Sequence, residues 1–433
     1  MKLKKFTMFN ILIIGFILFP FNSCSVQAEE TSEFDVNAEA GFAYDQKTGK
    51  ILYAKNEDKK LGIASITKII SAYLILEQIK QKKLKWDDKI PICNGYAYDL
   101  TLNPNLSNIP LEKDHGYSVR ELLNAALISS ASSAIIALTE KIAGSEEKFI
   151  ECTNKKLKSW GIKDVTLINS TGLNNADIPE KYRVKGSAPD QENMMSARDI
   201  GIVAYHLIHD FPEVLEITKK PTERFGVGSH SEVQLETWNG MLPGKNWEYS
   251  GVDGLKTGTT ELAGKCFVGT CVKAGWRIVT VVLHANGEGD SRFAETESLM
   301  SFVYDNWKQK KIVSKGDKFA TAKTVPVVDG KQSSVSIAIG EDIKAWVRSD
   351  MDTEKLSAHY HAGKIKDLKA PVTKDEKVGK IDIHLKDDNL GYLLPSQTKK
   401  AQYQMVTVKP VKRNFFLKIW VDHTLNWINK KLG

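Results

Sequence analysis

Ser65 and Lys68 are the residues best suited to chemistry in this sequence, and they lie three positions apart in Ser65-Ile66-Thr67-Lys68. In a helix this spacing places both side chains on the same side, one turn apart. The surrounding stretch, 61–79, is apolar on nearly every helical face and therefore predicts a buried helix. A buried lysine is costly unless something uses it, and a hydroxyl beside a neutral amine forms a nucleophile and base pair. The alternative is a capping serine with a lysine that reaches solvent.

A second candidate motif is Lys256-Thr257-Gly258-Thr259, which precedes a predicted hairpin over residues 265–283. We expect the motif at the head of a strand on this hairpin. Because Gly258 has no side chain, an extended peptide can lie against the strand as an added edge. The lysine and the two threonine hydroxyls are able to bind a carboxylate together, whereas the alternative is a polar turn that enters a strand.

A third polar stretch, Ser129-Ser130-Ala131-Ser132-Ser133, separates two apolar segments. The first segment begins with a capping box at Ser118 and continues to Ile128. The second runs over 134–142 and ends at Gly144. A serine-rich break between two buried helices is most often an N-cap, so this stretch gains interest only from the other two motifs.

The elements around these motifs follow from pattern and turn signals. Two short strands, Ala40–Tyr44 and Ile51–Ala54, are expected before the buried helix. A stretch punctuated by prolines, 87–115, predicts loops. Ser196 is expected to cap a helix that continues to about His209.

The last 120 residues have a different character. Residues 313–410 are rich in Val, Thr, Ile and Lys in alternating runs, which predicts a separate all-β domain. The terminal segment, 412–433, forms an amphipathic helix on a 100° wheel, with Trp420 and Trp427 on its apolar half. Its tryptophans, lysines and terminal position favour a helix in a membrane interface over one docked on the β-domain.

Residues 1–28 resemble an export signal, with three lysines, an apolar run over Ile11–Phe19 and small residues before Glu29. An uncleaved membrane span is the alternative, but this run is shorter than a bilayer requires. Cys24 raises a lipoprotein alternative, although the residues before it match a lipid-attachment site poorly. We therefore expect the mature protein on the extracytoplasmic face of a bacterial membrane.

The bulk composition is that of an ordinary soluble protein with room for two or three domains. The net charge is +7, and removal of the first 28 residues leaves 57 basic against 53 acidic side chains. That balance does not favour nucleic acid as a partner. The nine histidines form no HExxH pattern, so we expect no metal and no cofactor.

Four cysteines remain after the predicted signal. Export permits disulfides between them. Cys266 and Cys271 lie at odd spacing in one apparent strand, so their side chains face opposite ways and do not easily pair. Buried free thiols are the expected state, with Cys93 and Cys152 as the other two candidates for disulfides.

Taken in order, the three motifs resemble the catalytic set of penicillin-binding proteins and class A β-lactamases. With the export signal, the β-domain and the terminal helix, the chain resembles a low-molecular-weight penicillin-binding protein of the D-alanyl-D-alanine carboxypeptidase type, a serine peptidase of the S11 type. The resemblance runs from about Ala38 to the C-terminus, and further likenesses are Ser118–Leu123, Asn169–Leu173 and Val252–Gly254.

This resemblance implies an α/β (α+β) fold of the serine β-lactamase and transpeptidase type, with a central buried helix and an antiparallel sheet. The implied organisation is a signal peptide over 1–28, a catalytic domain over 29–308, a β-rich, sandwich-like domain over 309–411 and a membrane-anchoring helix over 412–433.

The implied activity is removal of the terminal D-alanine of a peptidoglycan pentapeptide, with covalent inhibition by penicillin. Ser65 would attack the carbonyl, Lys68 would take its proton and Ser130 would pass a proton to the leaving D-alanine. Lys256, with the hydroxyls of its motif, would hold the substrate carboxylate and depress the pKa of Lys68.

Two further residues enter only through the resemblance. Ser132 stands where the family usually has asparagine, and a hydroxyl lacks the paired donor and acceptor of a carboxamide. Arg292 matches a family arginine that orients the substrate region, and a structural salt bridge is its alternative. A β-lactamase, a transpeptidase and an impaired cell-wall binding protein remain alternative functions for the chain.

Overall fold

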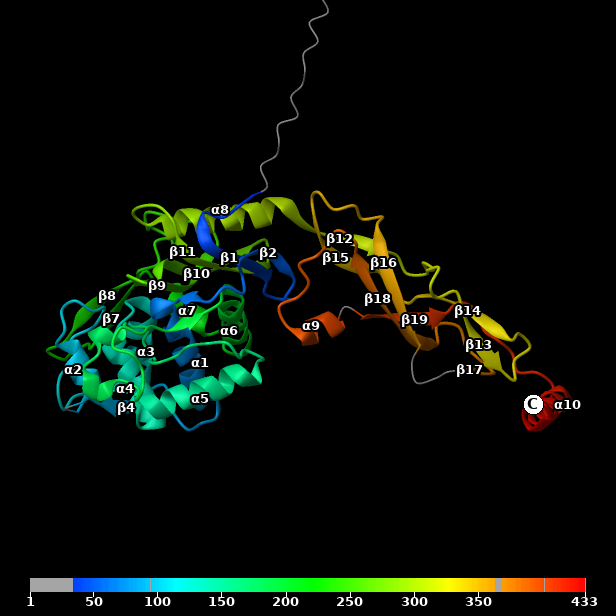
Figure 1. Cartoon of the computed structure of the whole chain (residues 1–433), viewed down its shortest axis with the longest axis horizontal. Helices are drawn as coiled ribbons and strands as arrows, with labels where there is room; N and C mark the ends of the chain where they lie inside the picture. Colours follow the sequence, from blue (N-terminus) through cyan, green and yellow to red (C-terminus); the bar gives the residue numbers. More distant parts are fainter. Residues whose placement is uncertain (1–33, 94, 363–367, 401, 433) are drawn as a thin grey trace, which may run out of the picture. The chain divides into compact units, whose positions relative to one another are not determined.

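The computed structural model describes residues 34–93, 95–362, 368–400 and 402–432 (Figure 1). The predicted export signal over residues 1–28 lies outside the described residues. Every element described below belongs to the unit that begins at Asp35.

A five-stranded antiparallel sheet carries the lysine motif. Its strand order is β2-β1-β11-β10-β9, so β9 lies at an edge. The predicted strands and the predicted hairpin are therefore present, but the lysine motif lies within a strand of its own, paired with the hairpin strand β10. The strands are β1 (Ala38–Asp45), β2 (Ile51–Lys55), β9 (Val252–Thr260), β10 (Gly264–Lys273) and β11 (Trp276–Ala285).

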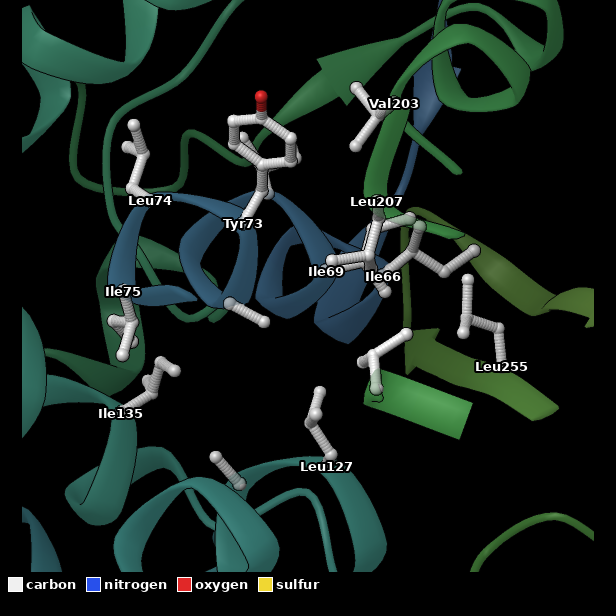
Figure 2. Close-up of a cluster of buried hydrophobic side chains, with 14 of the residues drawn as sticks. Ile66, Ile69, Tyr73, Leu74, Ile75, Leu127, Ile135, Val203, Leu207 and Leu255 are labelled. Carbon is white, nitrogen blue, oxygen red and sulfur yellow. The ribbon is translucent and has the colours of Figure 1, made fainter. Parts of the chain in front are cut away.

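Helix α1 (Thr67–Lys80) is the predicted buried helix, and its first ten residues are all buried. Apolar side chains surround it on several sides. In Figure 2, Ile69 of α1 lies among residues of other elements, including Leu127 and Leu207. The helices that contact α1 are α3 (Val119–Ile128), α4 (Ser132–Ala143), α5 (Glu146–Ser159) and α6 (Ala197–Asp210).

The predicted start of the buried helix at Leu61 is wrong. Leu61–Gly62 is a short strand, β3, that pairs with β6 (Met194–Met195), and a 3-10 turn, η1 (Ala64–Ile66), precedes α1. Partners distant in sequence decide this boundary, because the N–H of Ile63 donates to the carbonyl of Asn193 at 3.1 Å. Apolar periodicity does not report such bonds.

Local signals located three further helices well. Ser118 and Glu121 form the predicted capping box of α3, Ser196 caps α6, and α4 ends at Gly144 with φ +82°. The predicted loop over 87–115 is partly wrong, since it contains a strand and a helix. The remaining elements of this region are β4 (Lys89–Pro91), α2 (Tyr96–Thr101), β5 (Gly116–Ser118), η2 (Asn175–Asp177), η3 (Glu180–Tyr182), α7 (Val214–Thr218), β7 (Thr222–Phe225), β8 (Val233–Glu236) and α8 (Ser291–Asn306).

The cysteines of the described residues are free thiols. Cys266 and Cys271, which lie in β10, are buried as expected. Cys93 and Cys152 are exposed, so the expectation of burial is wrong for these two.

The C-terminal region is β-rich, as predicted, and has its own apolar core around Ile337, Ile381 and Met405. One short helix, α9 (Pro395–Lys400), interrupts it, so it is not all-β. A two-stranded sheet joins β12 (Trp307–Val313) and β15 (Ile343–Arg348), and a six-stranded sheet has the order β16-β18-β19-β14-β13-β17. Its strands are β13 (Thr324–Val328), β14 (Ser334–Ile339), β16 (Leu356–Ala362), β17 (Leu368–Lys369), β18 (Lys377–Leu385) and β19 (Gln402–Thr407).

The last element, α10 (Phe416–Leu432), matches the predicted terminal helix. Its large apolar side chains are exposed, with Phe416 at 77%, Trp420 at 61% and Trp427 at 59%. Within the described residues, no helix combines the length and the apolar character needed to cross a membrane.

Candidate active site

Ser65 and Lys68 lie together, as their spacing predicted. Lys68 Nζ is 3.0 Å from Ser65 Oγ and donates to the carbonyl of Thr171 at 2.9 Å. The lysine side chain has no exposed surface, whereas Ser65 is half-buried. The amine therefore lies in the interior and its partner hydroxyl lies at the boundary with solvent.

The backbone around Ser65 is tightly packed. Ala64, the residue before it, has φ +46°, a region that side chains other than glycine rarely occupy. Strand β9 approaches this turn so closely that a Cβ at Gly258 would lie 2.7 Å from the carbonyl oxygen of Ile63. Gly258 was predicted to leave room for a bound peptide. In the structure, the absence of a side chain at Gly258 is already needed for the close contact between β9 and the turn that carries Ser65.

Ser130 and Lys256 form a second hydroxyl and amine pair. Lys256 Nζ donates to Ser130 Oγ at 3.0 Å and to the carbonyl of Thr257 at 2.9 Å. Ser130 lies in the break between α3 and α4 and has φ +60°. The serine-rich break is thus more than an N-cap, because its backbone presents a hydroxyl to the lysine of β9.

Both lysines of the site have a pKa below the usual range of a lysine. Burial, and secondarily the charge of Lys256, hold the pKa of Lys68 well below its usual range. Burial and the nearby guanidinium of Arg292 lower the pKa of Lys256 to about 7. The lowered pKa of Lys68 favours its neutral amine, the form that is able to accept a proton from Ser65.

A cavity of about 320 Å³ joins the three motifs. It contains most of the hydroxyl groups singled out in the sequence and opens beside both serines. Its lining residues are Ser65, Ser107, Ser130, Trp238, Thr257, Gly258, Thr259, Asp290 and Arg292. Three motifs that are far apart in the sequence therefore meet in one cleft.

Arg292 reaches the end of the β9 motif. Its guanidinium donates to Thr259 Oγ1 at 2.7 Å and to the carbonyl of Gly258 at 3.0 Å. Its distance to the carboxylate of Asp290 is 4.0 Å, at the limit of an ion pair. Its Nε is buried without a hydrogen-bond partner among the described residues, so the guanidinium has donor capacity left.

Ser132 is placed differently from the other candidates. It is fully buried, it is absent from the cavity lining, and its Oγ has no hydrogen-bond partner within the described part of the chain. Its N–H donates to the carbonyl of Ser107 at 2.9 Å. In this structure the hydroxyl makes no contact with Lys68 of the kind that an asparagine carboxamide would make.

Sequence reasoning missed three lining residues, Ser107, Trp238 and Asp290. None belongs to a motif. Trp238 is 60% exposed and its indole N–H donates to the carbonyl of Ser129 at 3.1 Å, which fixes the ring at the cavity rim. Only the fold brings these side chains to the site.

Comparison with known families agrees with this geometry. The family model for D-alanyl-D-alanine carboxypeptidases, peptidase family S11, matches residues 26–287, and the model for the C-terminal domain of penicillin-binding protein 5 matches residues 307–409. This chain belongs to the S11 D-alanyl-D-alanine carboxypeptidase family. The predictions of family, fold class and enzyme type are thereby confirmed.

Individual members of the family are similar over most of their length. D-alanyl-D-alanine carboxypeptidase DacC of Escherichia coli is 29% identical over 93% of this chain and 92% of its own. DacF of Bacillus subtilis is 27% identical over 86% of this chain and 88% of its own. Among solved structures, PBP3 of Streptococcus pneumoniae, described as a peptidoglycan synthesis regulatory factor, is 39% identical, has a TM-score of 0.68 and covers 88% of this chain and 100% of its own.

A second solved structure bears on ligands. Penicillin-binding protein D2 of Listeria monocytogenes, solved with ampicillin bound, is 31% identical, has a TM-score of 0.50 and covers 63% of this chain and 99% of its own. A cefotaxime-bound form of that protein is also similar. Both β-lactams are therefore ligands of a relative that shares most of its length with this chain.

Proposed function

We propose that this carboxypeptidase acts through an acyl-enzyme on Ser65, with Lys68 as the general base. The observation that supports the proposal is the convergence of two hydroxyl and amine pairs on one cavity, Ser65 with Lys68 and Ser130 with Lys256. A neutral amine within 3.0 Å of a half-buried hydroxyl is the arrangement that activates a serine nucleophile.

The proposed reaction begins when Lys68 takes the proton of Ser65, whose oxygen attacks the carbonyl between two terminal D-alanines. The backbone N–H groups of Ser65 and Thr259 would stabilise the oxyanion, at about 3 kcal/mol per donor. Collapse breaks the peptide bond, and Ser130 gives its hydroxyl proton to the nitrogen of the leaving D-alanine. The proton that Lys68 took from Ser65 would then replace it, which leaves Ser130 protonated and Lys68 neutral again. Water then hydrolyses the ester and restores the free serine.

The substrate carboxylate would bind at the end of β9. Thr257, Thr259 and Arg292 line the cavity there, and the buried amine of Lys256 donates to Ser130, another lining residue. A fork of N–H donors suits a carboxylate, and this end of the cavity is the more cationic end. β-lactams, which carry a carboxylate and a reactive carbonyl, would enter the same site.

The test is covalent labelling by a fluorescent penicillin, followed by release of D-alanine from a pentapeptide. Ser65→Ala should abolish labelling, while Ser159→Ala, an exposed serine at the end of α5, should label like the wild type. Labelling of Ser65→Ala would remove this serine as the nucleophile. Absence of D-alanine release from a labelled wild-type protein would instead favour the cell-wall binding alternative.

The location of the enzyme is a second part of the proposal. We infer that residues 1–28 direct export and that α10 lies in the membrane interface, because its tryptophans and phenylalanines are exposed. The chain truncated before Lys412 should not sediment with anionic vesicles, whereas the full chain should. As a matched control, Trp420→Glu in the full chain should weaken sedimentation without removing the helix, and continued sedimentation of the truncated chain would show that the anchor lies elsewhere.

A further inference from the structure

Glu146 is a buried carboxylate that the mechanism above does not use. It begins α5, directly after the N-cap residue Ser145, and the residue is 7% exposed. No lysine or arginine within the described part of the chain stabilises its charge. Burial of a carboxylate without a counter-charge costs free energy unless hydrogen bonds compensate for it.

Both oxygens of Glu146 bind one residue, Ser170. Oε1 accepts the backbone N–H of Ser170 at 2.5 Å, and Oε2 accepts its hydroxyl at 3.0 Å. Ser170 is held from two other helices as well. Ser71 of α1 donates to its carbonyl at 2.7 Å, and Thr139 of α4 lies 3.4 Å from its hydroxyl.

The residue after Ser170 contacts the proposed base. Lys68 Nζ donates to the carbonyl of Thr171 at 2.9 Å, and the same nitrogen lies 3.0 Å from Ser65 Oγ. A neutral lysine amine has two N–H groups and one lone pair. An N–H held on the Thr171 carbonyl fixes the rotation of the amine and leaves the lone pair available to Ser65, so the position of this carbonyl affects how well the amine accepts the proton.

This chain depends on the Thr171 carbonyl more than the family pattern implies. Ser132 stands at the asparagine position, and its hydroxyl makes no hydrogen bond to Lys68 among the described residues. Among the described residues, the amine of Lys68 therefore has two acceptors, the Ser65 hydroxyl and the Thr171 carbonyl. Any movement of residues 170–171 therefore displaces the carbonyl that binds the amine of Lys68.

We propose that Glu146 is a positioning residue for Lys68: it clamps Ser170 and thereby fixes the Thr171 carbonyl that orients the amine. This inference rests on the proposed role of Lys68 as the base for Ser65. Burial raises the pKa of Glu146 to about 7, with Glu140 adding a weaker effect of the same sign, whereas the bonds from Ser170 oppose the rise. Among the described residues, Tyr96 of α2 is a further titratable group that faces Glu146 closely enough for the carboxylate to raise its pKa.

The experiment compares Glu146→Ala with Glu146→Gln in the full chain. A glutamine oxygen accepts the N–H of Ser170, and its amide donates to the Ser170 hydroxyl, so geometry is kept without charge. Acylation by a fluorescent penicillin is followed by stopped flow and separated into the binding constant and the first-order acylation step, each normalised to the titrated active fraction. Thr153→Ala, which removes from the same helix a buried hydroxyl that bonds to the carbonyl of Phe149, controls for general loss of stability.

We expect Glu146→Ala to slow the acylation step by roughly 10- to 100-fold with little change in binding, since small misplacements of a catalytic group have effects of this size. Glu146→Gln should stay within about threefold of the wild type, on the same argument. A merely structural role predicts a lower Tm and a smaller active fraction, as for Thr153→Ala, with an unchanged acylation step in the molecules that remain.

Two results would overturn the inference: an unchanged acylation step in Glu146→Ala, or a Glu146→Gln variant as slow as the alanine variant. If Glu146→Ala does not fold, Ser170→Ala removes one of the two contacts, and an unchanged acylation step in that variant would equally overturn it. A wild-type protein that is not acylated at Ser65 would refute the proposed function instead, so the two failures are distinguishable.

Discussion

Replacement of Gly172 by alanine should damage the site from the side opposite the substrate. Gly172 has φ +81°, and a Cβ placed on it would lie 1.8 Å from the carbonyl oxygen of Ala64 and 2.8 Å from Thr67 Oγ1. Ala64 immediately precedes Ser65, so the clash meets the backbone of the serine turn and not a flexible side chain. Relief of the clash requires the two segments to separate by about 1.5 Å, since ordinary contact begins near 3.4 Å.

The chain offers a matched control. Gly144, the residue that ends α4, has φ +82° and no atom within 4 Å of the position that a Cβ would take. Both alanine variants therefore carry the same left-handed strain of about 1–2 kcal/mol. Only Gly172→Ala adds overpacking, which costs about 1–3 kcal/mol even where side chains are able to yield.

The two variants are compared by thermal unfolding and by the acylation rate constant with a fluorescent penicillin. An additional 2 kcal/mol lowers Tm by about 4–8 °C for a domain of this order of size, so Gly172→Ala should melt that much below Gly144→Ala. Its acylation should fall by about 100-fold, because Ser65 moves with Ala64, while Gly144→Ala should acylate normally. Equal melting temperatures together with equal acylation rates would refute the packing argument.

Three further predictions concern the charged groups and the strained serine. Lys68→Met should lose acylation. In the wild type, Lys68 binds a proton in the unfolded state that it does not bind in the folded state, where its pKa is lowered, so Tm should rise with pH above neutrality. The Lys68→Met variant should show a smaller rise. As Lys256 deprotonates around its pKa of about 7, KM should rise between pH 6 and 8 for a D-Ala-D-Ala peptide and stay constant for its C-terminal amide. Ser130→Gly and Ser130→Ala should both acylate slowly, but the glycine variant should be more stable by about 1 kcal/mol, since Ser130 has φ +60°. Equal stability would show that this dihedral carries no strain.

The grouping of the candidate residues was predictable from the sequence because they belong to compact motifs. Ser65 and Lys68 are three residues apart, so helical geometry alone predicts that they meet. Lys256 and its hydroxyls are likewise consecutive. Capping signals added the helix boundaries at Ser118 and Ser196, where a side chain bonds to its own helix.

What the sequence could not supply depends on contacts between distant segments. No local sequence pattern predicts the bond from Lys68 to the Thr171 carbonyl or the bond from Ser170 to Glu146. Glu146 lies on a helix and Thr171 on a loop, and more than 20 positions separate them. The sequence also did not show why a glycine is needed at position 258, because the group that excludes a side chain there is the carbonyl of Ile63, which is distant in sequence. The shift of the helix start from Leu61 to Thr67 has this cause as well.

The division of roles between the cations of the site follows from where each lies. Lys68 is fully buried next to a second amine, and its pKa lies well below its usual range; Lys256 has a pKa of about 7. Burial lowers the pKa of Arg292 from its usual value, yet a guanidinium remains protonated in proteins. The site therefore combines a buried amine of lowered pKa beside Ser65 with a permanent charge at the far end of the β9 motif. Groups whose environments separate their pKa values in this way are suited to different tasks, and this separation supports the proposed roles: proton abstraction at Ser65 and carboxylate binding beside Thr259.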